Sequence, residues 1–323
     1  MTPTAPPLDV DYILPLRWDA DTSRAQRDEM TEYLYRVRHW ADVVVVDGSE
    51  AEVFAEHHRL WSPLVRHLAP EGPSTPNGKV GGVLTGIRVT GRGRLVIADD
   101  DVRYGLEELT EVVARLDRAG LCAPQNHFGP LTWHARWDTA RTLINRAFTA
   151  DYPGTLAVRR DLIADGYRAD VLFENLELVR TVMARGGQVD WARGVYVRRL
   201  PPTARHFWGQ RVRQAYDSHA QPARLAAELL LLPAWVLQAR CPAGYLVWLA
   251  AAVAVAERGR RVDGGGAVYE RSAAWWAPIW LAERAVTAWI AVAWRLGGGV
   301  PYAGGRLRHA ASSLNSLRRS RHG

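Results

Sequence analysis

Short apolar runs alternate with stretches of helically spaced apolar residues over the first two-thirds of the chain. Each short run has the length and composition of a strand that is buried on both faces of a sheet. The expected strands are residues 12–18, 42–46, 95–98 and 121–124. The expected helices are residues 30–40, 53–61 and 106–116. This β-α-β-α-β order predicts an α/β fold of Rossmann-like type, with a mostly parallel sheet and helices on both faces.

The size and composition of the chain are those of a folded protein. It has 323 residues, of which 48% are apolar and 23% charged, so it can bury a core and is not wholly disordered. Cys122 and Cys241 form no Cys-x-x-Cys pair, which excludes a thiolate zinc site and a disulfide framework and favours a reducing compartment. Residues 1–9 lack the order of a signal peptide, so we expect a disordered N-terminus that stays in the cytosol.

The positive charge of the chain is distributed unevenly. The formal net charge is +7, but Lys79 is the only lysine among the 41 basic residues. Such replacement of lysine by arginine is typical of a GC-rich genome, so the number of arginines says little about a nucleic-acid partner. From Arg295 to the end there are six arginines and no acidic residue. Since no nucleic-acid-binding motif is present, we expect this basic tail, residues 297–323, to face an anionic membrane.

A tryptophan-rich apolar region, residues 219–296, precedes the basic tail and holds half of the 14 tryptophans. Its runs 225–239 and 244–256 are each shorter than the ~20 residues of a straight transmembrane helix, so together they predict one kinked span or a re-entrant hairpin. The run 272–294 contains Glu283-Arg284 and is predicted to be an interfacial helix, because a charged pair is costly at the centre of a bilayer. A buried helical pair in a soluble domain is the alternative.

Acidic residues directly follow two of the expected strands. Asp47-Gly48-Ser49 follows the strand at 42–46, and Asp99-Asp100-Asp101 follows the strand at 95–98. In open parallel sheets, ligands bind at the carboxyl ends of the strands. Three consecutive carboxylates repel one another unless a cation or hydrogen-bond donors lie beside them, and hard oxygen ligands suit Mg²⁺ or Mn²⁺ held with substrate phosphates. The alternatives are a helix cap for Asp47 and an exposed acidic turn for the aspartate run.

The single lysine lies in a second motif, Asn77-Gly78-Lys79, at the start of another expected helix. A compact ammonium group beside glycines at a helix N-terminus is well suited to an anionic ligand. Chance survival of one lysine on a surface turn is the alternative.

The order of these motifs resembles the nucleotide-sugar domain of family 2 glycosyltransferases, which has the GT-A fold. Three further segments continue the resemblance, which covers about residues 10–218 and is followed by a membrane-associated C-terminus. These segments are Gly154-Thr155-Leu156-Ala157-Val158-Arg159-Arg160, Phe173-Glu174-Asn175-Leu176-Glu177-Leu178 and Gln210-Arg211-Val212-Arg213-Gln214. The segment 298–306 resembles, more weakly, the end of ceramide-glucosyltransferase-like enzymes.

The resemblance implies a metal-dependent site for a nucleotide-sugar donor, with Mg²⁺ or Mn²⁺ held by Asp99 and Asp101. In this reading Asp47 bonds the base or ribose, and Arg211 and Arg213 either clamp the diphosphate or form a solvated or lipid-facing row. The implied donor-binding residues are Pro15, Arg17, Asp47, Gly48, Ser49, Lys79, Asp99, Asp100, Gln210, Arg211 and Arg213. The implied acceptor-side residues are Gly154, Thr155 and Asn175.

Two positions depart from the pattern of the family. Asn175 replaces the aspartate that is commonly the catalytic base, and Gln214 replaces the tryptophan of the last motif. We predict that Glu174 is the base, and Glu177 is the competing carboxylate. The alternative is that either glutamate only caps the helix and has no catalytic role. His134 lies between two tryptophans and either lines an acceptor groove or is a satisfied core or surface histidine.

These observations predict an inverting glycosyltransferase that moves one sugar from a nucleotide-sugar donor to a lipid or lipid-linked acceptor. Its catalytic domain, residues 10–218, would lie on the cytosolic face of the cell membrane. A lipid acceptor is favoured because this domain leads directly into the apolar region. The alternatives are a soluble-acceptor glycosyltransferase with a membrane anchor, a non-catalytic nucleotide-sugar-binding membrane protein, and a nucleotidyltransferase.

Overall fold

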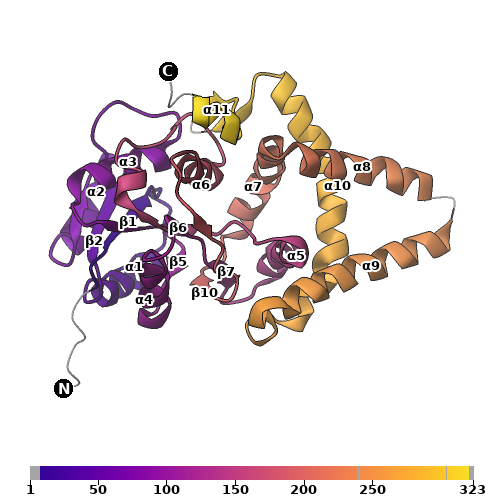
Figure 1. Cartoon of the computed structure of the whole chain (residues 1–323), viewed down its shortest axis with the longest axis horizontal. Coiled ribbons are helices and arrows are strands. Elements are labelled where there is room, and N and C mark those ends of the chain that lie inside the picture. The colour runs from indigo at the N-terminus through magenta and orange to yellow at the C-terminus, as the bar shows by residue number, and fades with distance from the viewer. Residues whose placement is uncertain (1–7, 239–240, 303, 320–323) are drawn as a thin grey trace.

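The computed structural model describes residues 8–238, 241–302 and 304–319, and consists of an α/β half and a helical half (Figure 1). Most of the segment that was expected to be disordered, residues 1–7, lies outside the described residues.

A seven-stranded sheet forms the centre of the α/β half. Its strands are β1 (Asp11–Leu16), β2 (Asp42–Asp47), β3 (Arg66–Leu68), β4 (Arg94–Ala98), β6 (Leu121–Cys122), β8 (Thr155–Arg159) and β9 (Val189–Asp190). They lie in the order β3-β2-β1-β4-β8-β6-β9. Strand β8 is antiparallel to its neighbours β4 and β6, and the other neighbouring strands are parallel. The predicted α/β fold with a mostly parallel sheet is confirmed.

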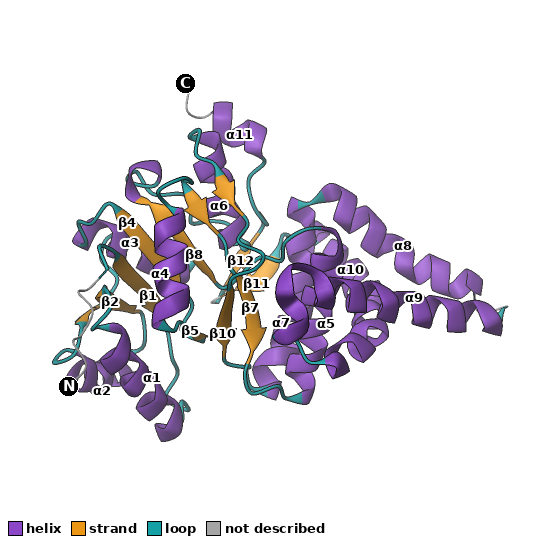
Figure 2. Ribbon diagram, turned by 60° about the horizontal axis from the view of Figure 1, so that its bottom comes forward, coloured by secondary structure: helices purple, strands orange, loops and turns teal. Residues whose placement is uncertain are grey.

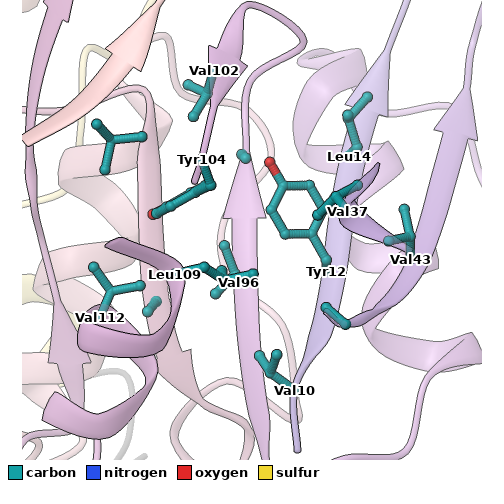
Figure 3. Packing of buried hydrophobic residues seen from close by; sticks show 14 of the residues in the cluster. Val10, Tyr12, Leu14, Val37, Val43, Val96, Val102, Tyr104, Leu109 and Val112 are labelled. Carbon is teal, nitrogen blue, oxygen red and sulfur yellow. The ribbon is translucent and has the colours of Figure 1, made fainter. Parts of the chain in front are cut away.

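Helices cover both faces of this sheet (Figure 2). They are α1 (Arg24–Val37), α2 (Ala51–Trp61), α3 (Gly78–Val89), α4 (Leu106–Arg115) and α6 (Glu174–Ala184). Successive strand residues point to opposite faces of the sheet, so Tyr12 packs in a cluster with α1 and α4 (Figure 3). Its neighbour Ile13 packs in a second cluster with α3 and α6. Gly86 lets α3 approach β1 closely, since a Cβ atom there would lie 2.5 Å from Cγ2 of Ile13.

A second, three-stranded sheet joins the two halves. It consists of β5 (Val102–Arg103), β10 (Tyr196–Arg199) and β7 (Gln125–Phe128), in that order. In the antiparallel pair of β5 and β10, Arg199 lies opposite Val102. This register places Arg199 beside the aspartate run that precedes β5.

Five helices build the other half: α5 (Trp133–Phe148), α7 (Ala204–Tyr216), α8 (Pro222–Gln238), α9 (Pro242–Arg261) and α10 (Ala277–Leu296). Helix α10 packs against α5, α7 and α8, and α5 packs against α9. Helices α8 and α9 extend away from the rest of the molecule (Figure 1). None of the helices in the described part of the chain combines the length and the apolarity needed to cross a bilayer.

The helix that was predicted to be interfacial, residues 272–294, corresponds largely to α10, but its charged pair faces the protein. Oε2 of Glu283 lies 3.6 Å from Nη1 of Arg211 on α7, and the Arg284 side chain is fully buried. The charges of both residues are therefore enclosed between helices. This differs from the expectation because α10 covers α5 and α7, which the sequence alone did not place beneath it.

The C-terminal segment folds back onto the α/β half. Strands β11 (Val300–Tyr302) and β12 (Gly305–Leu307) pair antiparallel, and α11 (Leu314–Arg319) follows. The backbone N–H of Phe173 donates to the carbonyl of Ala310 at 2.7 Å. The described part of the expected basic tail is therefore packed against the strand and helix ends of the predicted catalytic domain.

Candidate active site

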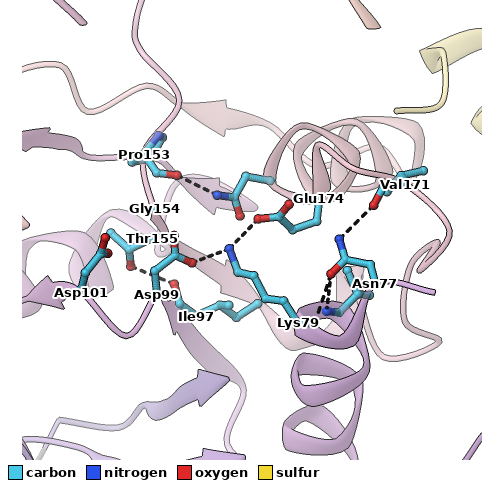
Figure 4. Close-up of polar contacts among 12 residues, drawn as sticks. Asn77, Lys79, Ile97, Asp99, Asp101, Pro153, Gly154, Thr155, Val171 and Glu174 are labelled. Atoms are coloured by element: carbon cyan, nitrogen blue, oxygen red, sulfur yellow. Dashed lines mark hydrogen bonds and ion pairs between the residues drawn. The ribbon is translucent and has the colours of Figure 1, made fainter. Parts of the chain in front are cut away.

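Charged side chains from four elements gather at one edge of the main sheet. Strands β1, β2 and β4 are parallel, so their carboxyl ends meet at this edge. Asp47 ends β2, and Asp99 follows β4 directly. Lys79 lies in the first turn of α3 and Glu174 in the first turn of α6, and both point toward Asp99 (Figure 4).

The ammonium group of Lys79 lies between two carboxylates. Its Nζ is 2.5 Å from Oε1 of Glu174 and forms an ion pair with Oδ1 of Asp99 (Figure 4). Burial lowers the pKa of Lys79, but the charges of Asp99 and Glu174 outweigh burial and raise that pKa well above its ordinary value. The cap of α3 fixes this lysine, because Oδ1 of Asn77 accepts a hydrogen bond from its backbone N–H at 3.1 Å.

Arg199 is a second cation of the cluster, which sequence analysis did not single out. Its Nε lies 2.8 Å from both carboxylate oxygens of Asp101, and its Nη2 lies 3.2 Å from Oδ2 of Asp99. Burial raises the pKa of Asp101 to about 6; the Arg199 charge opposes this rise, and the charges of Asp99 and Asp100 add to it. Nothing local marks Arg199 among the many arginines, because only the pairing of β10 with β5 brings it to the aspartates.

The two glutamates of α6 lie in different surroundings. Glu174 is partly exposed beside Lys79, whereas Glu177 is fully buried and its Oε2 accepts a hydrogen bond from Ser312 N at 2.5 Å. Only Glu174 therefore faces the charged cluster. The amide of Asn175 donates to the carbonyl of Pro153 at 2.9 Å, so the residue that replaces the family aspartate ties α6 to the segment before β8.

Position 154 requires a glycine, because the backbone there comes very close to the charged cluster. A Cβ atom at this position would lie 2.8 Å from Oδ2 of Asp99 and 3.0 Å from Cζ of Arg199. Its neighbour Thr155 is buried, and its hydroxyl donates to the carbonyl of Ile97 at 2.8 Å. Both residues shape the edge between β4 and β8, and contact of either with an acceptor remains a prediction.

Asp47 has partners within the protein. Its buried Oδ2 lies 2.7 Å from Nδ1 of His57 and 3.2 Å from Nε2 of His67, and its Oδ1 accepts a hydrogen bond from Ser49 N. Burial raises the pKa of Asp47, but these hydrogen bonds outweigh burial and hold the pKa well below its ordinary range. The expected contact of Asp47 with the base or ribose stays a prediction; its side chain is fully buried in this structure and organises the loop after β2.

Two predicted donor residues near the end of β1 have separate surroundings. Pro15 is buried under α3, and a Cβ atom added to Gly82 of this helix would lie 3.1 Å from Cβ of Pro15. Pro15 therefore packs against α3, and its contact with a donor stays a prediction. Arg17 is exposed, and its guanidinium lies 3.5 Å from Oε1 of Glu50.

Trp18 links the two strand-end motifs. Its backbone N–H donates to Oγ of Ser49 at 2.9 Å, and its indole N–H donates to Oδ2 of Asp100. The backbone N–H of Gly48 donates to the carbonyl of Leu16 at 2.8 Å, which holds the loop after β2 against β1. These contacts keep the loops after β2 and β4 together at the sheet edge.

The motif at residues 210–214 lies on α7, and its side chains lie in two different environments. The guanidinium of Arg213 lies over the ring of Tyr302, 4.9 Å from its centroid, and Gln210 contacts His206 one turn earlier. Arg213 and Gln210 remain predicted donor-binding residues.

Arg211, in contrast, is buried in the helical half. Its Nη1 lies 2.8 Å from Oδ1 of Asp138 on α5, with Glu283 of α10 as a second partner. This guanidinium is paired between helices, and its assignment to the diphosphate stays a prediction. His134 is also buried, with Nε2 2.7 Å from the carbonyl of Pro202, whereas its Nδ1 is buried without a hydrogen-bond partner among the described residues, so it is only partly satisfied.

Asp217, at the end of α7, is another acidic residue that sequence analysis missed. Burial, followed by the charge of Glu174, raises the pKa of Asp217 to about 8, while Arg284 and Arg224 oppose the rise. Its Oδ1 is buried and has no hydrogen-bond partner within the described residues. At neutral pH Asp217 therefore holds a proton within electrostatic range of Glu174.

The carboxylates of Asp99 and Asp101 fit a divalent cation that also binds phosphate. Both supply hard oxygen ligands, and Oδ1 of Asp99 is buried with the Lys79 charge beside it but no hydrogen bond. Among the described residues, no three His, Cys, Asp or Glu side chains are grouped so that they could hold a metal ion. Mg²⁺ commonly binds through one or two carboxylates together with substrate phosphates. Asp99 and Asp101 would accordingly hold Mg²⁺ or Mn²⁺ jointly with a diphosphate.

The order of the sheet, its covering helices and the aspartates at the strand ends define a fold of the GT-A type found in nucleotide-sugar glycosyltransferases. A mannosyltransferase from Pyrobaculum calidifontis, solved in complex with GDP-Man and Mn²⁺, shares this fold with a TM-score of 0.53 and 19% sequence identity. The alignment covers 89% of this chain and 90% of the mannosyltransferase. The similarity therefore extends beyond residues 10–218 into the helical half.

Two further solved structures align over less of the chain. Glucosyl-3-phosphoglycerate synthase from Mycobacterium tuberculosis has 17% identity and a TM-score of 0.41, with 62% of this chain and 74% of that chain covered. Mannosyl-3-phosphoglycerate synthase from Rubrobacter xylanophilus has 17% identity and a TM-score of 0.38, with 62% and 69% covered. No protein-family model and no curated protein matches the sequence.

Proposed function

We propose that this protein is an inverting glycosyltransferase that transfers one sugar from a nucleotide-sugar donor to a lipid or lipid-linked acceptor. The observation that carries the proposal is the cluster of Asp99, Asp101, Lys79 and Glu174 at the carboxyl edge of a GT-A-type sheet. The GDP-Man and Mn²⁺ in the mannosyltransferase of the same fold support a nucleotide-sugar donor and a divalent cation for this chain.

The residues of the cluster match the charge changes of sugar transfer. A nucleoside diphosphate gains negative charge as the bond to the sugar breaks, and Lys79 and Arg199 place two positive charges where the diphosphate would lie. A divalent cation at Asp99 and Asp101 would supply Lewis-acid stabilisation of the same leaving group. Since both protein cations are paired with carboxylates here, binding of the diphosphate would exchange some of these pairs for contacts with phosphate.

Glu174 is the proposed base of this reaction. Inverting transfer needs a carboxylate that takes the proton of the acceptor hydroxyl on the side of the sugar opposite the leaving group. Glu174 is the glutamate of α6 that reaches the cluster, and Asn175 cannot accept a proton at neutral pH. As Lys79 turns toward a bound diphosphate, it would leave the Glu174 carboxylate free to accept that proton.

The proposed lipid acceptor and membrane location are supported by the surface of α8 and α9. Both helices expose large apolar side chains near the ends that extend away from the body (Figure 1). The exposed fractions reach 75% for Leu237 and 69% for both Leu246 and Val247. We propose that this pair of helices inserts into the cytosolic leaflet of the cell membrane and places the active site near lipid-linked acceptors.

Binding and turnover with a panel of nucleotide sugars test this function. The wild-type protein should be stabilised by one nucleotide sugar in the presence of Mn²⁺, and Asp101→Asn should lose the Mn²⁺-dependent part of that shift while staying folded. Glu174→Gln should lower turnover on the order of 10²–10⁴-fold with unchanged donor affinity. The controls are Asp165→Asn, at an exposed position, and Glu107→Gln, in the first turn of α4.

The outcomes separate the alternatives. Donor binding without hydrolysis or transfer would favour a non-catalytic protein, and release of pyrophosphate from a nucleoside triphosphate would identify a nucleotidyltransferase. Transfer to water-soluble sugars but not to lipid-linked ones would favour the soluble-acceptor enzyme. No stabilisation by any nucleotide sugar would refute the proposed function.

A further inference from the structure

Strand β11 brings an aromatic side chain to the candidate active site. Strand β11 ends at Tyr302, whose hydroxyl donates a hydrogen bond to Oδ1 of Asn77 at 3.1 Å. The two residues are 225 positions apart in the sequence. Asn77 caps α3 and also holds the backbone of Lys79, so the phenol lies next to the turn that carries the active-site lysine.

The ring of Tyr302 is surrounded by the charged residues of the candidate site. Arg213 of α7 lies over the ring at 4.9 Å. The other charged groups that act on the phenol are Glu174, Lys79 and Arg17. Burial, followed by the charge of Glu174, raises the pKa of Tyr302, so its hydroxyl keeps its proton and donates to Asn77 at neutral pH. Tyr302 thus lies beside Arg213 of α7 and the N-terminal cap of α3, within electrostatic range of Glu174 and of Arg17, which follows β1.

The described residues that follow Tyr302, from residue 304 on, are attached to both halves of the molecule. The hydroxyl of Tyr216 donates to the carbonyl of Arg308 at 2.7 Å, and Leu172 N donates to the carbonyl of His309 at 3.0 Å. Val300 and Leu307 are buried in a cluster with residues of α6 and α7. A ring held in this way has a fixed position relative to Glu174, as a residue that shapes a substrate subsite requires.

We propose that Tyr302 is a donor-site residue whose ring forms the wall of the subsite for the transferred sugar. The inference rests on the proposed function and adds a residue to it. A phenol ring offers a rigid apolar face at low entropic cost, and a sugar ring presents C–H groups on one of its faces. Ligand sites commonly combine such an aromatic wall with a few placed polar groups, here Lys79, Arg213 and Glu174. The wall would also keep water away from the bond that breaks.

Affinities for matched ligands test this assignment without requiring turnover. GDP-Man is compared with GDP, and UDP-Glc with UDP, for the wild type, Tyr302→Phe and Tyr302→Ala. Tyr302→Ala should weaken binding of the nucleotide sugar about tenfold more than binding of the nucleoside diphosphate, because only the sugar loses its wall. Tyr302→Phe should retain the preference for the nucleotide sugar. Tyr35→Ala, which removes a half-exposed tyrosine from α1, should change neither affinity.

Different results would overturn the assignment of Tyr302 and the proposed glycosyltransferase function. Equal weakening of nucleotide sugar and nucleoside diphosphate in Tyr302→Ala, or loss of the sugar preference in Tyr302→Phe, would overturn the sugar wall and leave the transferase intact. Tyr302→Leu, which keeps apolar volume without a ring, replaces Tyr302→Ala if that variant is unfolded by circular dichroism. If the wild type binds none of the four ligands, both proposals are overturned.

Discussion

At the scale of single residues, the candidate site is a balance of charges from distant parts of the chain. Asp99, Asp101 and Glu174 supply three carboxylates, and Lys79 and Arg199 supply two cations within ion-pair distance of them. Like charges at such distances repel, so each carboxylate is stabilised by the cation beside it. A ligand that brings a diphosphate together with a divalent cation can replace these pairs with little change in net charge.

Asp217 provides a test of electrostatics at this scale. Its pKa is about 8 in the folded protein, against about 3.9 for an unfolded aspartate. Between these values the folded state keeps a proton that the unfolded state has lost, so the wild type loses stability as the pH rises from about 4 to about 8. Asp217→Asn removes this titration and should gain stability relative to the wild type over that range, by at least about 1 kcal/mol.

Urea unfolding of both proteins at pH 5 and pH 8 measures this difference. Asp165→Asn, at an exposed position, is the control and should show the same difference from the wild type at both pH values. An Asp217→Asn variant that behaves like the control would contradict the raised pKa of Asp217.

At the scale of elements, α6 connects the candidate base to the C-terminal segment. Its first residue is Glu174, and one turn later Glu177 accepts the backbone N–H of Ser312. Arg180 of the same helix donates to the carbonyl of Ser312 at 2.7 Å. Three successive turns of α6 therefore contact the cluster or the C-terminal segment, which explains why a helix whose first residue is only partly buried is held in one position.

Glu177→Ala tests this anchoring. The substitution leaves the N–H of Ser312 without its buried acceptor, so we expect a loss of about 1–3 kcal/mol in the free energy of unfolding. Glu174→Gln, one turn earlier and partly exposed, should change stability by less than about 1 kcal/mol. Chemical denaturation followed by circular dichroism compares the two variants. Equal stability of both would show that Glu177 does not anchor the C-terminal segment.

At the scale of the whole molecule, the predicted division into a catalytic domain and a separate membrane part is crossed by shared cores. One cluster joins Leu143 of α5 to Ala256 of α9 and Trp280 of α10. Another joins Leu176 of α6 to Val300 of β11. A chain cut after residue 218 would expose both clusters, so the helical half is part of the folded body. The far ends of α8 and α9 keep exposed apolar side chains, among them Leu237, Leu246 and Val247.

The membrane proposal is tested at those ends. Leu237→Glu combined with Leu246→Glu places two charges on side chains that are 75% and 69% exposed, so folding stability should change little. Co-sedimentation with vesicles of phosphatidylglycerol and phosphatidylcholine should fall on the order of tenfold, because charged side chains oppose insertion into the leaflet. Leu106→Glu, on α4 of the α/β half, is the control. Release of the wild type by high salt alone would show that arginines, not the apolar ends, hold the protein at the vesicle.

The sequence by itself determined the features that depend on neighbouring residues. The apolar runs predicted β1, β2, β4 and β6, and helical spacing predicted α1, α2 and α4. The aspartates that end β2 and follow β4 were found in the same way, because a strand and the residues after it are contiguous in the chain. Lys79 stood out because it is the only lysine.

Only the tertiary structure decided which side chains meet. Arg199 reaches the aspartates through the pairing of β10 with β5, and Tyr302 reaches Asn77 because the chain end folds back over α6. Arg211 and Asp47 were assigned to a donor from their motifs, yet Arg211 forms an ion pair with Asp138, and the Asp47 carboxylate forms hydrogen bonds with two histidines. Contacts between distant segments depend on which whole surfaces are buried against each other and not on local residue patterns. A motif can therefore locate a strand end without showing which residues its side chains contact.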